Sequence, residues 1–178
     1  MYYGAQGRSM LRPCHSLPRR PPPTRPNSHT IHHGKPPMKA TIIYQGGMHF
    51  LGRTDSGHNL HLDSAHSGEK TAGPTPIEMV LQAAAACSAM DVVAILQKRR
   101  KEIASFDLEV EGDRRDEHPR TFRSLKVHYR VVGPGITFDE VERAVKLSHD
   151  RYCSVINMLK PAVEVSYSVE VPPQDLEK

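Results

Sequence analysis

The chain has 178 residues, a length that suits one ordinary domain with or without a tail. Apolar residues make up 38% of it and charged residues 25%, which argues against a fully disordered chain and against a coiled coil. Three cysteines are too few for a disulfide scaffold. With no tryptophan and 6% aromatic residues, the chain lacks a stacking platform for nucleic acid.

The net charge of +4 is concentrated at the N-terminus. Residues 1–37 contain six basic residues, no acidic residue and eight of the 15 prolines, so we expect a disordered tail. This tail has no apolar stretch typical of a secretory signal, and its prolines disfavour the helix of an organellar transit peptide. A translation start at Met38 is an open alternative.

The remaining residues carry 18 basic and 20 acidic side chains, which excludes an electrostatic footprint for DNA or RNA. We expect a cytoplasmic domain over residues 38–172, followed by a short C-terminal tail at 173–178.

The N-terminal part of this domain has the pattern of a three-stranded meander. Residues 39–44 and 48–52 read as strands that flank a Gly-Gly turn, and residues 58–63 alternate strictly between apolar and polar. A polar stretch with two glycines and a proline follows over residues 64–74.

A long apolar helix is predicted over residues 75–100. Thr75, Pro76 and Glu78 form a capping box with proline at the first helical position. The helix is apolar on nearly every side, which is typical of a buried helix. It is close to the length of a membrane span, but Asp91 within it and the basic residues at its end favour a core helix.

The second half of the domain repeats the strand and helix patterns. Residues 106–112 and 122–132 alternate as strands, residues 137–160 have helical apolar spacing, and residues 162–171 alternate again. The predicted class is α+β with the order β-β-β-α-β-β-α-β. Two helices cannot cover a six-stranded sheet and also bury a helix that is apolar all round, so we predict a homodimer with a shared core.

Two cysteines of the domain, Cys87 and Cys153, each lie in a predicted helix and each precede a serine. Their separation fits no metal-binding motif, and we expect no metal site. One interpretation is that both are small buried core residues. The other is a redox pair, in which one thiol becomes a sulfenic acid and the second resolves it as a disulfide.

The sequence resembles the OsmC/Ohr family of thiol-dependent hydroperoxide reductases. The resemblance runs from about Lys39 to Val171, and its anchors are residues 73–78, residues 84–89 and residues 152–155. The stretch that follows the first cysteine is most similar to the YhfA-like branch of OsmC-like proteins. The resemblance implies an intertwined α+β homodimer with two long central helices and active sites at the subunit interface.

By the same resemblance, Cys87 corresponds to the peroxidatic cysteine and Cys153 to the resolving one. Active members of the family add an arginine that lowers the thiol pKa and a glutamate that holds the arginine. Arg53 is the best candidate for the first by position, although a surface arginine on a strand is an equal alternative. Ile77 stands where the glutamate is expected, and Glu78, one residue later, is fully explained by its role in the capping box.

Asp91 lies four residues after Cys87, on the same helical face. A carboxylate there opposes thiolate formation, so Asp91 either organises the site or forms a buried structural pair. His149 lies four residues before Cys153 and could reach its thiol, although a solvent-facing position is more common for such a histidine. We assign no role as a base to His49, His58, His61 or His128.

Two functions therefore compete. The first is a cysteine-based peroxidase that reduces organic hydroperoxides in oxidative-stress defence. The resemblance implies no bound cofactor for it, and an external dithiol reductant such as a lipoylated protein or a small thiol. The second is a non-catalytic OsmC-like dimer that binds a small apolar ligand or senses oxidants. No nucleic-acid or membrane partner is expected.

Overall fold

The computed structural model describes residues 36–64 and 70–173. The chain divides after Pro37 into two units, and the helices and strands described below all belong to the second. The predicted tail at residues 1–37 lies almost entirely outside the described residues, as does most of the tail at 173–178. Both remain predictions.

The first three strands form an antiparallel sheet in the order β1-β2-β3. They span Ala40–Gly46, His49–Thr54 and Asn59–Leu62, as the predicted meander requires. The turn between β1 and β2 contains Gly46 and Gly47, both at positive φ, a conformation that favours glycine. The strand register places a set of apolar side chains on one face of this sheet: Ile42, Tyr44, Phe50, Leu60 and Leu62.

The other three strands form a separate sheet in the order β4-β5-β6. They span Ser105–Arg114, Phe122–Val132 and Glu164–Glu170. β4 pairs with β5 antiparallel, whereas β6 pairs with β5 in parallel because the connecting helices carry the chain back across the sheet. The six strands of one chain therefore make two sheets, and the single six-stranded sheet assumed from the sequence is wrong.

Helix α1 spans Pro76–Lys98 and begins at the predicted capping box. The Thr75 side chain accepts the N–H of Glu78, and the Glu78 carboxylate accepts both the N–H and the hydroxyl of Thr75, each at 2.7 Å. Four side chains at intervals of one helical turn are buried: Ala84, Ser88, Val92 and Leu96. By length and composition, α1 is the one helix of the described residues that could cross a membrane, and 28% of its apolar window is buried in this chain.

The second predicted helix is interrupted. Helix α2 spans Phe138–Leu147, one turn of π-helix, η1, spans Ser148–Tyr152, and helix α3 spans Ser154–Leu159. Cys153 lies between them with an extended backbone, so it is not inside a continuous helix as predicted. Tyr152 lies four residues after Ser148, where regular helical spacing places it on the apolar face. The wider turn shifts that spacing, which explains why Tyr152 is exposed.

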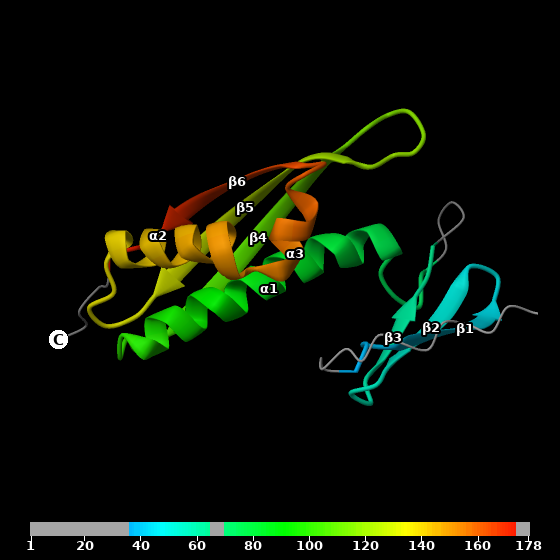
Figure 1. Ribbon diagram of the computed structural model, residues 1–178, viewed down its shortest axis with the longest axis horizontal. Coiled ribbons are helices and arrows are strands. Elements are labelled where there is room, and N and C mark those ends of the chain that lie inside the picture. Colours follow the sequence, from blue (N-terminus) through cyan, green and yellow to red (C-terminus); the bar gives the residue numbers. More distant parts are fainter. Residues whose placement is uncertain (1–35, 65–69, 174–178) are drawn as a thin grey trace, which may run out of the picture. The chain divides into compact units, whose positions relative to one another are not determined.

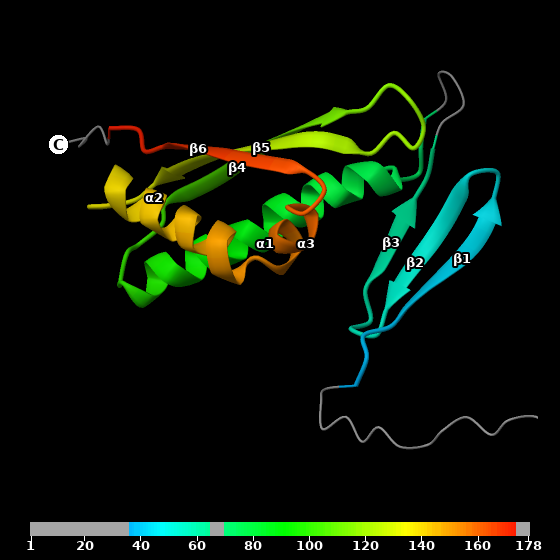
Figure 2. The ribbon, with the colours of Figure 1, turned by 45° about the horizontal axis from the view of Figure 1, so that its top comes forward.

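The helices α1, α2 and α3 lie on one face of the β4–β6 sheet (Figure 1), and the second view shows the same layering (Figure 2). The alternation along β5 buries every side chain that faces these helices, including Val127 and Tyr129. One core cluster joins Val92 and Leu96 of α1 to β5 and α2. A second cluster joins Ala84 to α3 and contains both cysteines of the domain.

Candidate active site

Two thiols from distant parts of the sequence meet in the second core cluster. Cys87 projects from the middle of α1 and is half-buried, whereas Cys153 is completely buried. Both are free thiols packed in the same cluster, and Cys87 is close enough to raise the pKa of the Cys153 thiol. The structure thus brings the two predicted site cysteines into one cluster, with Cys87 partly exposed and Cys153 fully buried.

The backbone around Cys153 is held from both sides. Its N–H donates to the carbonyl of Ser148 across the π-turn at 2.9 Å, and its carbonyl accepts the side-chain amide of Asn157 at 2.9 Å. Its sulfur caps α3 by accepting the N–H of Ile156 at 3.4 Å. The break between η1 and α3 therefore positions this sulfur toward α1.

Burial raises the pKa of the Cys153 thiol far above its ordinary range. The N–H of Ile156 opposes this effect, while the neighbouring Cys87 and the negative charge of Asp91 reinforce it. Cys153 is therefore protonated at neutral pH and needs a proton acceptor before it can act as a nucleophile.

Beside the thiols, five side chains form a continuous hydrogen-bonded chain. Asp91 Oδ2 accepts the hydroxyl of Ser148 at 2.9 Å, and Ser148 Oγ lies 3.0 Å from Ser88 Oγ. Ser88 Oγ pairs closely with the Tyr129 hydroxyl, which lies 2.8 Å from His149 Nε2. We call this set the hydroxyl chain. It links α1, β5 and the π-turn inside an otherwise apolar core.

The hydroxyl chain has only one consistent direction, because each hydroxyl has a single proton. Ser148 donates to Asp91, so its oxygen must accept from Ser88. Ser88 must then accept from Tyr129, and Tyr129 from His149. His149 is consequently the tautomer with its proton on Nε2, and every proton of the chain points toward the Asp91 carboxylate.

The burial of His149 corrects the expectation of a solvent-facing histidine. The side chain is 2% exposed, and its ring packs against that of Tyr167 with centroids 4.8 Å apart. Burial, and then the charge of Lys160, lower the His149 pKa to about 4. Burial also raises the pKa of Tyr129 well above its ordinary value. Both groups are therefore neutral over the physiological range.

The two predicted activating residues do not join the thiols within this chain. Arg53 is exposed on β2, and Glu78 is engaged by Thr75, whose N–H and hydroxyl lower its pKa. Arg53 is not among the groups that act on the Cys153 thiol. Of the three predicted accessory residues, Asp91 alone lies where its charge reaches this thiol.

Three members of the hydroxyl chain were not singled out from the sequence, Ser88, Tyr129 and Ser148, whereas His149 was considered only as a neighbour of Cys153. Ser88 offered a signal, since it is one of few polar residues in an apolar helix and follows Cys87 directly. Tyr129 faces inward by the alternation of its strand. Helical spacing places Ser148 on the inward face of its helix, but it gives no sign of the hydroxyls that Ser148 and His149 meet there.

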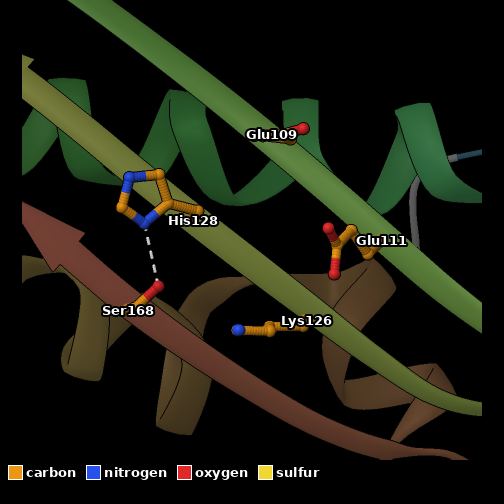
Figure 3. A pocket seen from close by; sticks show the side chains of 5 residues that line it. All are labelled: Glu109, Glu111, Lys126, His128 and Ser168. Carbon is orange, nitrogen blue, oxygen red and sulfur yellow. Dashed lines mark hydrogen bonds between the residues drawn. The ribbon is translucent and has the colours of Figure 1, made fainter.

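A polar depression of about 160 Å³ lies on the opposite face of the β4–β6 sheet (Figure 3). It is lined by Glu109, Glu111, Lys126, His128 and Ser168, and His128 Nδ1 lies 2.9 Å from Ser168 Oγ. These side chains alternate with the buried ones, so they point away from the thiols. This charged face is a solvated surface. Within residues 36–64 and 70–173, no cluster of three potential ligands could hold a metal ion.

Comparisons with known proteins identify the family to which this chain belongs. The sequence profile of the family described as OsmC-like protein matches residues 67–168. The chain is 43% identical over 134 residues to the protein YhfA of Escherichia coli K12, an alignment that covers 75% of this chain and 98% of YhfA.

Solved structures show the same fold. A hypothetical protein from Aquifex aeolicus matches with a TM-score of 0.67 at 28% identity, over 78% of this chain and all of that one. An organic hydroperoxide resistance protein from Elizabethkingia anophelis matches with a TM-score of 0.59 at 16% identity, over 79% of this chain and 99% of that one. The predicted α+β OsmC-like fold is confirmed.

Replacing Tyr129 with phenylalanine should destabilise the protein by about 1–3 kcal/mol, because it leaves buried Ser88 and His149 without their partner. Urea unfolding monitored by circular dichroism measures the loss. Tyr167→Phe is the matched control, since its ring packs on the same histidine but its hydroxyl is not in the chain. Equal losses for both variants would contradict the proposed importance of the hydroxyl chain.

His149 should remain neutral, with its proton on Nε2, down to about pH 4. Nitrogen-detected NMR of the imidazole rings reports both the tautomer and the titration. Because the unfolded histidine titrates near 6.5, the stability contributed by neutral His149 is complete above that pH. It is lost at up to about 1.4 kcal/mol per pH unit as the pH falls toward 4. A proton on Nδ1 alone would show that the chain runs in the other direction.

Proposed function

Because the chain belongs to the OsmC-like family, we propose that it is a cysteine-based peroxidase that reduces organic hydroperoxides through Cys87 and Cys153. The observation that carries this proposal is the packing of half-buried Cys87 and fully buried Cys153 in one core cluster. It is supported by similarity of fold to proteins described as organic hydroperoxide resistance proteins.

In the first step, the Cys87 sulfur attacks the distal oxygen of the hydroperoxide. The O–O bond breaks, the thiol proton passes to the leaving alkoxide, and the products are a Cys87 sulfenic acid and an alcohol. Cys87 takes this role because Cys153 is completely buried. The apolar side chains near Cys87, including Val80 and Leu81, suit an alkyl hydroperoxide.

In the second step, the Cys153 sulfur attacks the Cys87 sulfenic sulfur, and water leaves as the disulfide forms. An external dithiol, such as a lipoylated protein or a small dithiol, then reduces the disulfide to two thiols by exchange. No bound cofactor is needed for this cycle. Its setting would be defence against oxidants in the cytoplasm.

A homodimer completes the proposal, because one chain leaves large apolar surfaces open. Ile42 and Tyr44 on the apolar face of the β1–β3 sheet are 57% and 63% exposed, and Met90 on α1 is 72% exposed. Large exposed apolar patches mark interaction sites. A second copy would cover these surfaces and leave the charged outer face of β4–β6 in water.

The dimer would also provide a route for activating Cys87. Arg53 is exposed on β2 and takes no part in the thiol site of its own chain. Arg53 of a second copy can supply the cation that favours a thiolate. Glu78, engaged at its helix cap, is less suited to hold that arginine.

A second candidate is a non-catalytic dimer that binds a small apolar ligand or senses oxidants. A surface cavity of about 530 Å³ next to the thiol site favours it, because Ala94, Ile95 and Leu147 contribute an apolar wall. Asp91, which opposes thiolate formation, also lines this cavity. A protein of this kind would bind without turnover.

Cys87→Ser should abolish reduction of cumene hydroperoxide by dihydrolipoamide. Cys153→Ser should allow one oxidation and then stop, with a sulfenic acid on Cys87 that dimedone traps and mass spectrometry identifies. Cys14, the third cysteine, lies in the predicted tail at residues 1–37, so Cys14→Ser is the matched control and should leave turnover unchanged. Binding of an apolar ligand without any turnover by the wild type would favour the second candidate.

The protein should sediment as a dimer at micromolar concentration in analytical ultracentrifugation. Met90→Glu should weaken the dimer without unfolding the chain, since this side chain is already exposed. Glu109→Lys, on the charged outer face, is the control and should leave association unchanged. A wild-type monomer would contradict the predicted shared core.

A further inference from the structure

The outer face of the β4–β6 sheet carries a serine and a histidine that are paired across two strands. The parallel register sets Ser168 of β6 opposite His128 of β5, and Ser168 Oγ lies 2.9 Å from His128 Nδ1. Both side chains line the depression of about 160 Å³, and Figure 3 shows the hydrogen bond between them. The two residues are forty positions apart in the chain, so only the sheet register brings them together.

A carboxylate holds the other nitrogen of the same imidazole ring. His128 Nε2 lies 3.3 Å from Glu170 Oε2, and the second carboxylate oxygen of Glu170 lies 3.6 Å from Arg130 Nε. A carboxylate only accepts hydrogen bonds, so neutral His128 carries its proton on Nε2. Its Nδ1 is then an acceptor, to which the Ser168 hydroxyl donates. A nucleophile, a base and a group that orients the base are therefore within reach of one another, the arrangement that activates a serine.

The other residues of the depression limit what this serine can meet. Lys126, two residues from His128 on β5, supplies an ammonium group that can stabilise negative charge on a carbonyl oxygen. Glu109 and Glu111 on β4 line the same depression and repel an anionic substrate. Its volume of about 160 Å³ is below the range of drug-sized pockets, which begins at about 300 Å³. The site therefore suits a small, uncharged molecule.

We propose that Ser168 is a nucleophile that transfers short acyl groups from small neutral esters to water. In this activity His128 is the general base, and Glu170 is a positioning residue that fixes the tautomer of His128. The activity is separate from the thiol cycle, because side chains on this face of the sheet point away from Cys87 and Cys153. The two sites can therefore be tested independently.

In the first step, the Ser168 oxygen attacks the carbonyl carbon of the ester while its proton passes to His128 Nδ1. The bond between this carbon and the alcohol oxygen breaks, the departing alkoxide takes the proton from His128, and the products are an acyl-serine and the alcohol. In the second step, water attacks the acyl-serine and gives a proton to His128. The acyl group leaves as the acid, and the Ser168 oxygen takes the proton back. One ester and one water thus give one acid and one alcohol.

The test treats the full-length protein with p-nitrophenyl acetate and localises the acetyl groups by tandem mass spectrometry after acid quenching. Thiols and lysines also react with this ester, so the readout is the acetyl group on Ser168 itself and not the release of nitrophenol. Ser168 should be acetylated, whereas Ser166 should not. Ser166 is the matched residue, because it lies on the same face of β6 but its hydroxyl donates to the carbonyl of Leu125 at 3.5 Å.

His128→Gln should lower the rate of Ser168 acetylation by about 100-fold, the low end of the usual contribution of a general base. Glu170→Gln should lower it less, because the base remains. In that variant, nitrogen-detected NMR should show that His128 no longer keeps its proton on Nε2 alone, a change that a merely structural role would not produce. Ser166→Ala is the control and should leave Ser168 acetylation unchanged.

Acetylation of Ser168 no faster than that of Ser166 would overturn the inference, as would acetylation confined to lysines and thiols. A wild-type rate of Ser168 acetylation in His128→Gln would also overturn it. The side chains of His128 and Glu170 are 38% and 49% exposed, so both variants should melt at the wild-type temperature. If His128→Gln nevertheless does not fold, the acetylation rate and the tautomer of Glu170→Gln decide the question.

Discussion

The hydrogen bond between the hydroxyls of Ser88 and Ser148 is the contact on which the site depends. It joins the middle of α1 to the π-turn, two segments that are sixty residues apart in the chain. A buried hydroxyl is costly unless it is paired, so this contact forms only when both segments pack in one register. That register brings Cys87 and Cys153 together, and it directs the Ser148 proton to Asp91.

The core around this contact separates two chemical environments. On one side, the apolar cluster around Ala84 and Ile156 encloses the thiols and keeps Cys153 protonated. On the other side, the hydroxyl chain provides the Ser148 hydroxyl as a hydrogen-bond donor to the Asp91 carboxylate, so this charge is not buried without a partner. Half-burial of Asp91 at a surface cavity reduces the desolvation cost that a fully enclosed carboxylate would carry.

The exposed apolar surfaces set a further constraint. Large apolar side chains on the β1–β3 sheet and on α1 are exposed in the single chain, and exposed apolar patches mark interaction sites. The charged outer face of β4–β6, in contrast, offers no reason for association. In the proposed cycle, Arg53 of a second copy supplies the cation that activates Cys87, so the proposal links oligomeric state to thiol reactivity.

The sequence alone determined the elements, because capping boxes, turn glycines and alternation act over a few residues. Thr75 and Glu78 mark the start of α1, and the strand over residues 122–132 matches β5. The motifs around Cys87 and Cys153 sufficed for the family. Only the tertiary structure decided that the six strands make two sheets, that a π-turn interrupts the second helix, and that His149 is buried. These features depend on which distant groups meet, and the partner of a buried hydroxyl such as Ser148 is chosen by packing, not by its neighbours in the chain.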